Sequence, residues 1–160
     1  MEKDSNTELG KILDTLRKNG FKSNFEFEHT SSLENCWKVI SDWSNISWVL
    51  GMKDVKIIEP LYGKPNRELI KKDDGIVGEI LLEADEKTHK IAYYVYASSW
   101  PLKHYMGELS LSQPEKGTGC IWRYQATYIP KDGVDVEKFK GPFEQGFKTY
   151  NIPFLKGTNF

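Results

Sequence analysis

Runs of hydrophobic, β-branched and aromatic residues, separated by short polar segments, predict a succession of β-strands along most of the chain. The first run alternates strictly, as Phe25-Glu26-Phe27-Glu28-His29, which is typical of a strand that buries one face. The predicted strands cover residues 25–29, 54–60, 67–72, 76–84, 90–98, 104–113 and 118–129. Turn-forming segments such as Asp73-Asp74-Gly75 separate consecutive runs, so the spacing favours an antiparallel meander.

An amphipathic helix is predicted near the start of the chain, at residues 7–18. Its hydrophobic residues recur at helical spacing and form one stripe: Leu9, Ile12, Leu13 and Leu16. Asn19-Gly20 follows, and a glycine at this place commonly ends a helix. We therefore assign residues 1–20 to an N-terminal helical extension and residues 21–160 to the main domain.

Two short helices are predicted after the first strand. Ser31 or Ser32 can cap the first of them, because a serine hydroxyl accepts a hydrogen bond from the first helical turn. The segment Asp42-Trp43-Ser44-Asn45 is expected to end that helix and to begin a second one, which runs through Trp48.

The end of the chain predicts one further helix. Aromatic residues recur there at helical spacing: Phe143, Phe147, Tyr150 and Phe154. Gly141-Pro142 is expected to break any helix that starts near residue 135, and Pro153 does not suit a helix interior. We expect a turn or short helical piece at residues 135–140, then the main helix from Pro142 to about Ile152.

Composition and charge narrow the possible functions. The chain has 22 Lys and Arg against 23 Asp and Glu, and this balance argues against a nucleic-acid footprint. Residues 1–6 are not a signal-peptide core and no run is as long as a membrane span, so we expect a cytoplasmic protein. Cys36 and Cys120 are expected to be buried thiols, and the three histidines have no metal-ligand spacing.

The hairpin around Trp100-Pro101-Leu102 is unusual, because ordinary hairpin turns use asparagine, aspartate and glycine. The bulky side chains of this hairpin suit a loop that lies over another part of the protein. Together with the Trp-rich segment before the strands and the aromatic helix after them, this hairpin resembles the hydrophobic-ligand-binding START-like superfamily. That superfamily includes polyketide cyclases, the birch-pollen allergen, abscisic-acid receptors and lachrymatory factor synthase. The resemblance covers roughly residues 25–155 and is greatest to the polyketide cyclase/dehydratase branch.

The resemblance implies an α+β helix-grip fold. In this fold a curved antiparallel sheet of six to seven strands wraps around a C-terminal helix, with two short helices after the first strand. One helix cannot fill the concave face of such a sheet, so a pocket remains. The outer face would then be apolar at Ile80, Leu82, Tyr94 and Tyr96 and would need a cover. Either the N-terminal helix or the second subunit of a homodimer could provide it.

The resemblance also implies a catalytic trio of Arg67, Glu79 and Tyr105, because the receptors and the synthase carry an arginine, a glutamate and a tyrosine at matching positions. A carboxyl group in an apolar cavity is poised for proton exchange, an arginine can stabilise an oxyanion, and a tyrosine can donate to a carbonyl. The alternatives are a surface charge for Arg67, a cross-strand lysine pair for Glu79 and a core position for Tyr105.

The expected ligand-binding residues line the same pocket: Trp48, Tyr93, Val95, Trp100, Leu102, Arg123, Phe143, Phe147 and Asn151. Periodicity alone would bury Trp122 and Tyr124 and leave Arg123 outside, whereas alignment with the receptors turns Arg123 inward, and we follow the alignment. Ser47 stands where the receptors have the lysine that anchors the ligand carboxylate, which argues against abscisic acid as ligand.

The favoured hypothesis is an enzyme that uses no cofactor and performs acid–base chemistry on a small hydrophobic metabolite with a carbonyl group, as a cyclase, dehydratase or isomerase does. A non-catalytic carrier or sensor of a hydrophobic or lipid-like ligand is the main alternative. A third possibility is an interaction protein whose cavity is filled by its own aromatic side chains, since aromatic residues make up 13% of the chain.

Overall fold

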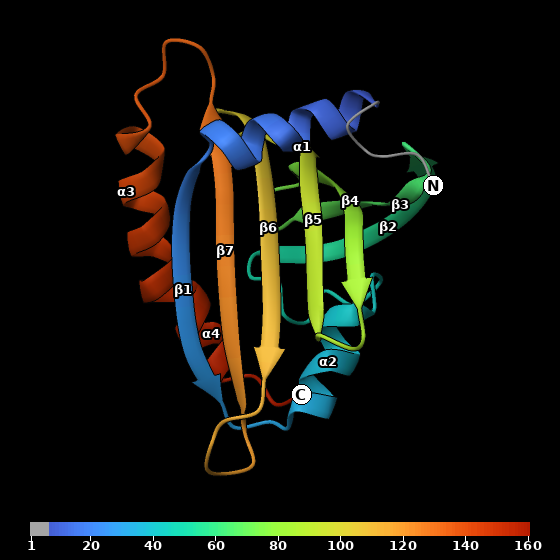
Figure 1. Ribbon diagram of the computed structural model, residues 1–160, viewed down its shortest axis with the longest axis vertical. Helices are drawn as coiled ribbons and strands as arrows, with labels where there is room; N and C mark the ends of the chain where they lie inside the picture. Colours follow the sequence, from blue (N-terminus) through green and yellow to red (C-terminus); the bar gives the residue numbers. More distant parts are fainter. Residues whose placement is uncertain (1–6) are drawn as a thin grey trace.

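One seven-stranded antiparallel sheet dominates the computed structural model, which describes residues 7–160 (Figure 1). Its strands are β1 (Phe21–His29), β2 (Met52–Leu61), β3 (Lys64–Lys71), β4 (Ile76–Asp85), β5 (Lys90–Ala97), β6 (Leu102–Ser112) and β7 (Cys120–Pro130). The order across the sheet is β1-β7-β6-β5-β4-β3-β2, so β2 to β7 form a meander and β1 closes it beside β7. This arrangement confirms the predicted strands, although β1 begins at Phe21 rather than Phe25.

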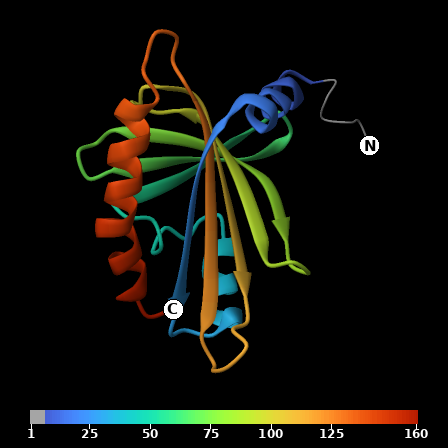
Figure 2. The ribbon, with the colours of Figure 1, turned by 60° about the vertical axis from the view of Figure 1, so that its left-hand side comes forward.

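Helix α1 (Glu8–Asn19) packs across the outer face of the sheet (Figures 1 and 2). Thr7 caps it by accepting a hydrogen bond from the Gly10 amide at 2.9 Å. Together the helix and the strands beneath it bury a separate apolar cluster of Leu9, Leu13, Leu16, Ile80, Tyr94 and Met106. Helix α1 therefore covers the apolar outer face, which is the first of the two covers that the sequence left open. Residues 1–6 of the predicted extension lie outside the described residues.

The C-terminal helix is longer than predicted and lies on the opposite face of the sheet (Figure 2). It runs for 20 residues as α3 (Glu137–Gly146), one π-helical turn (Phe147–Asn151) and α4 (Ile152–Lys156). The expected break at Gly141-Pro142 is wrong. Pro142 lies on the exposed side of α3, where water can hydrate the carbonyl group that it leaves unpaired.

The π-helical turn explains how Pro153 fits in the same helix. The Ile152 amide donates to the Phe147 carbonyl, five residues back, which widens the helix immediately before Pro153. Pro153 then occupies the first turn of α4, a position that requires no amide hydrogen.

Helix α2 (Leu33–Ser41) follows β1 and is capped by Ser32, which accepts from the Asn35 amide at 3.1 Å. The second short helix that was predicted through Trp48 is instead a pair of turns. Asp42 and Asn45 each accept a hydrogen bond from the amide two residues later, and such side-chain bonds compete with helix formation.

The sheet separates two apolar cores of unequal size. The larger core lies between the sheet, α2 and the C-terminal helix and includes Phe25, Trp122 and Phe147. Cys36 and Cys120 are buried there as free thiols, as predicted. Within residues 7–160, no helix is both long enough and apolar enough to cross a membrane.

Candidate functional site

A cavity of about 170 Å³ lies within the larger core, between the concave face of the sheet and the C-terminal helix. Most of its wall is apolar or aromatic, with contributions from Trp48, Leu69, Val77, Trp122, Phe147 and Leu155. A dry protein cavity of about 150 Å³ can hold benzene, so this one has room for a molecule of roughly one ring. Sites for larger ligands usually measure about 300–1,000 Å³.

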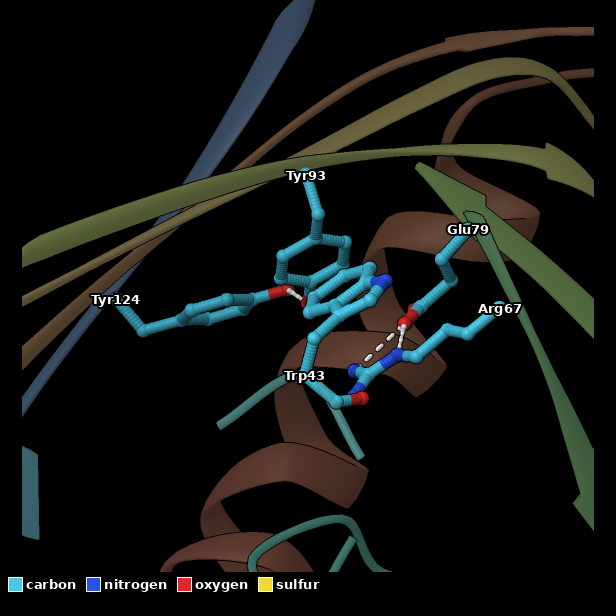
Figure 3. A network of polar contacts seen from close by, with 5 residues as sticks. All are labelled: Trp43, Arg67, Glu79, Tyr93 and Tyr124. Carbon is cyan, nitrogen blue, oxygen red and sulfur yellow. Dashed lines mark hydrogen bonds and ion pairs between the residues drawn. The ribbon is translucent and has the colours of Figure 1, made fainter. Parts of the chain in front are cut away.

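Glu79 provides the carboxyl group on the cavity wall, and Arg67 holds it in place. The two residues lie directly opposite each other on β3 and β4. The Nε and Nη2 atoms of Arg67 both donate to Oε1 of Glu79, at 3.0 and 2.8 Å (Figure 3). Within residues 7–160, the second oxygen, Oε2, has no hydrogen-bond partner.

Trp43 fixes the other side of the guanidinium group. Its backbone carbonyl accepts from Nη1 of Arg67 at 2.9 Å, and its indole ring lies 3.6 Å from Cζ of the same residue (Figure 3). All three nitrogens of Arg67 are thus engaged, and only 1% of the residue is exposed. Arg67 is therefore a support behind Glu79, since it does not belong to the cavity wall.

Burial controls the protonation of Glu79, of which only 5% is exposed. Desolvation raises the pKa of this carboxyl group, and the positive charge and hydrogen bonds of Arg67 oppose that rise in part. A raised pKa brings a carboxyl group closer to the pH range in which a general acid or base has to exchange protons.

Three tyrosine hydroxyl groups meet on the cavity wall beside β5, β6 and β7. The Tyr124 hydroxyl is hydrogen-bonded to the Tyr93 hydroxyl at 2.6 Å (Figure 3) and also to the Tyr105 hydroxyl. Burial raises the pKa of each of the three phenols, so they are neutral donors at neutral pH. Gly107 makes room for them, because a Cβ atom there would collide with the Tyr93 and Tyr124 hydroxyls.

The structure places most of the sequence-predicted site residues around this cavity. Those on the wall are Trp48, Glu79, Tyr93, Trp100, Tyr105, Phe143, Phe147 and Asn151. Val95 and Leu102 instead belong to the surrounding core. The face shared by Phe143, Phe147 and Asn151 points into the cavity, as their four-residue spacing indicates.

Arg123 does not reach the cavity, so the expectation that it faces inward is wrong. Its side chain is 53% exposed on the outer face of the sheet, where Nε lies 2.6 Å from Oε1 of Glu26 on the neighbouring strand β1. Strand β7 buries Trp122 and Tyr124 on the inner face instead. The alternation of the strand therefore decides the orientation, because a one-residue shift would put two aromatic rings into water.

Sequence reasoning missed Tyr124 and Trp43 as site residues. The alternation of residues 118–129 already indicated that Tyr124 is buried, and that signal was overruled by the alignment. In the sequence Trp43 stands at the end of a predicted helix, and no local pattern indicates that its ring covers an arginine from β3.

Among the described residues, neither a metal ion nor a carboxylate ligand has an evident binding group at this cavity. The described residues contain no group of three histidine, cysteine or acidic side chains placed to hold a metal ion. Ser47, at the position of the receptors' anchoring lysine, is exposed and donates its hydroxyl to the Asn45 side chain at 2.7 Å.

Comparison with solved structures places this architecture among known folds. A protein from Bacillus thuringiensis has a TM-score of 0.68 and 19% identity, with 84% of this chain and 99% of that chain covered. XoxI from Bacillus cereus has a TM-score of 0.66 and 20% identity, covering 84% and 95%. Ara h 8.0201, a Bet v 1-like protein, has a TM-score of 0.66 and 11% identity, covering 87% and 97%.

The chain has the START-like helix-grip fold. The resemblance seen in the sequence is thus confirmed for the fold. No family model matches the chain, and a search of the curated proteins finds no match either.

Proposed function

We propose that this protein binds a small, neutral, hydrophobic metabolite with a carbonyl group in the cavity and performs acid–base chemistry on it without a cofactor. The observation that carries the proposal is the Glu79 carboxyl group, which lies on an otherwise largely apolar wall with Oε2 unpaired among the described residues. Its raised pKa suits a cyclase-, dehydratase- or isomerase-like reaction.

The chemistry would begin with proton transfer. The Glu79 carboxylate removes a proton from the carbon next to the ligand carbonyl. The electron pair of that C–H bond forms a C=C bond to the carbonyl carbon, and the π electron pair of the carbonyl moves to its oxygen. A tyrosine hydroxyl donates a hydrogen bond to the resulting enolate oxygen. In a ligand whose enolate is conjugated with a C=C bond, the protonated carboxyl group then returns the proton to the far carbon of that system, the carbonyl re-forms and the ligand is isomerised. In a ligand with a hydroxyl group on the carbon beyond the α-carbon, the proton goes to that hydroxyl instead, and the enolate electrons expel it as water while a C=C bond forms. Arg67 keeps Oε1 in place, so Oε2 handles the proton.

Hydrogen–deuterium exchange tests this proposal without knowledge of the natural substrate. In D₂O, the wild-type protein should accelerate exchange of the protons next to the carbonyl of cyclohexanone, measured by proton NMR, and the rate should saturate with ketone concentration. Glu79→Gln keeps the shape but cannot accept the proton, so it should lower the rate by about 10²–10⁴-fold. Tyr105→Phe should lower it less, because the tyrosine only polarises the carbonyl group.

Glu83→Gln is the matched control, since Glu83 lies on the same strand but is exposed. It should exchange at the wild-type rate. Exchange by Glu79→Gln at the wild-type rate would remove the catalytic role of this carboxyl group.

A carrier or sensor is the second candidate, and the Arg67–Glu79 pair itself favours it. Two hydrogen bonds on one buried oxygen are also what a purely structural ion pair would show. On this alternative, extraction of the purified protein with organic solvent followed by mass spectrometry should yield a stoichiometric ligand. Glu79→Gln and Tyr105→Phe should then weaken binding by about 1–3 kcal/mol for each buried polar group left unpaired, with no turnover to lose.

A further inference from the structure

We propose that Tyr93, Tyr105 and Tyr124 form a recognition site for one acceptor oxygen of the ligand, and that this site selects a ketone or aldehyde of about one ring. This inference rests on the proposed ligand-binding function of the cavity. It goes further by naming the three side chains that recognise the carbonyl oxygen and the size of molecule that they select. All three phenols are more than nine-tenths buried and lie on the cavity wall.

The hydrogen-bond geometry of the cluster leaves one of its protons for an acceptor from outside it. Three hydroxyl groups carry three protons, and two hydrogen bonds join them with good geometry, Tyr93 to Tyr124 and Tyr124 to Tyr105. Tyr93 and Tyr105 also interact, but their hydroxyls do not meet hydrogen-bond geometry, so the third proton is held weakly. Within residues 7–160, no other side chain or backbone group is hydrogen-bonded to these oxygens. A buried donor without a partner is costly, so an acceptor oxygen in the cavity would be favoured there.

The same wall argues against a charged ligand. Arg67 already uses its Nε, Nη1 and Nη2 atoms on Glu79 and Trp43, and no lysine or arginine lies on the wall among the described residues. A carboxylate ligand would therefore meet an ionisable carboxyl group and no free cation. The volume of about 170 Å³ limits the ligand to roughly the size of a substituted ring.

The location of the cluster also sets the orientation of the ligand. Tyr93 lies on β5, next to β4, which carries Glu79. Burial first, and the nearby negative charge of Glu79 in addition, raise the pKa of Tyr93 and that of Tyr105. A carbonyl oxygen held by the phenols would thus leave its neighbouring carbon near β4, within the region where the carboxyl group acts.

The test compares two isosteric probes, cyclohexanone and methylenecyclohexane, which differ in an acceptor oxygen. Their affinities for the wild-type protein are measured by NMR titration and expressed as a ratio. The measurement is repeated on the triple variant Tyr93→Phe/Tyr105→Phe/Tyr124→Phe, because any smaller set of substitutions still leaves at least one hydroxyl group that can donate. The preference for the ketone should fall about tenfold or more in the triple variant, since both probes keep the same ring contacts.

Tyr94→Phe/Tyr96→Phe is the control, because these two phenols lie on the outer side of the sheet and bond to His104 and Asn66. It should leave the ratio unchanged. If the triple variant does not fold, the infrared carbonyl stretch of cyclohexanone bound to the wild-type protein decides. A lower wavenumber than in hexane supports donation from the cluster, and a hexane-like value overturns it.

The outcomes also separate this inference from the proposed function. If both probes bind in the cavity and their ratio is the same in wild type and triple variant, the cavity binds ligand but the acceptor site is wrong. If neither probe binds, both proposals fail. If exchange next to the carbonyl is absent while the ratio falls as expected, the acceptor site holds and the catalytic proposal fails.

Discussion

At the residue scale, the Arg67–Glu79 pair determines the electrostatics of the cavity. Only 1% and 5% of these residues are exposed, so neither charge is solvated by bulk water. Pairs of this kind contribute little net stability relative to apolar residues, because desolvation offsets their attraction. Removing one partner is different, because the remaining charge is left buried and unpaired. The ion pair is therefore best tested by replacing Arg67.

Arg67→Met should lower the free energy of unfolding by about 3–5 kcal/mol at neutral pH, because Glu79 then loses its partner in a buried position. Without Arg67 the folded pKa of Glu79 lies further above its unfolded value. Stability from such a group is present below the unfolded pKa and is lost as the pH rises through the folded pKa. The cost of the substitution, measured by urea unfolding, should therefore grow between pH 5 and pH 8.

The double variant Arg67→Met/Glu79→Leu serves as the control for that measurement. It removes both charges, so it should recover most of the stability and show no growth of the cost with pH. A cost for Arg67→Met that is independent of pH, or equal in the double variant, would contradict the account of this pair.

The orientation of a single side chain could be predicted from the sequence wherever it depends only on the position of the residue in the fold. Glu79 and Tyr105 lie on the cavity wall, as the resemblance implied. Arg123 shows the limit, because a distant alignment conflicted with the alternation of its own strand and the alternation was right. The contact between Trp43 and Arg67 joins residues 24 positions apart, and no local pattern encodes it.

At the element scale, the strands and α1 could be predicted because each carries a repeating apolar pattern. The C-terminal helix was predicted too short, since proline is normally a reason to end a helix. Two local features allow the helix to continue through both prolines. Pro142 lies where its unpaired carbonyl partner can be hydrated, and a π-helical turn precedes Pro153. Solvent exposure and helix widening depend on tertiary packing, which periodicity does not report.

A substitution of Gly107 on β6 tests whether the packing of this strand determines the position of the tyrosine hydroxyls. Gly107 pairs directly with Tyr93, and a Cβ atom there would meet the Tyr93 and Tyr124 hydroxyls. Gly107→Ala should therefore displace these hydroxyls, cost about 1–3 kcal/mol in stability and weaken cyclohexanone binding measured by NMR titration.

Gly78→Ala on β4 is the matched control for Gly107→Ala. Its Cβ atom would crowd the Tyr96 ring, on the side of the sheet away from the cavity. It should lower stability by overpacking but leave cyclohexanone affinity unchanged. Equal loss of affinity in both variants would show that general destabilisation, and not the tyrosine cluster, controls binding.

At the scale of the whole molecule, a sheet with two covered faces accounts for the distribution of apolar residues. The outer core is filled by α1, whereas the inner core, between the sheet and the C-terminal helix, retains a cavity. The existence of that cavity followed from the predicted fold. Its volume did not, because rings such as Phe143, Phe147 and Trp122 occupy much of the concave space. Those rotamers and the reach of the helix are properties of the assembled structure.

The most direct test of the central claim is a methyl NMR titration of the wild-type protein with cyclohexanone. The two cores provide an internal comparison, because Leu69, Val77 and Leu109 line the cavity, whereas Leu13 of α1 and Ile80 beneath that helix belong to the outer core. We expect saturable shifts at the first group and none at the second. Absence of saturable shifts at the cavity methyls, or equal shifts in both cores, would contradict the claim that this fold binds a small apolar molecule at the Glu79 cavity.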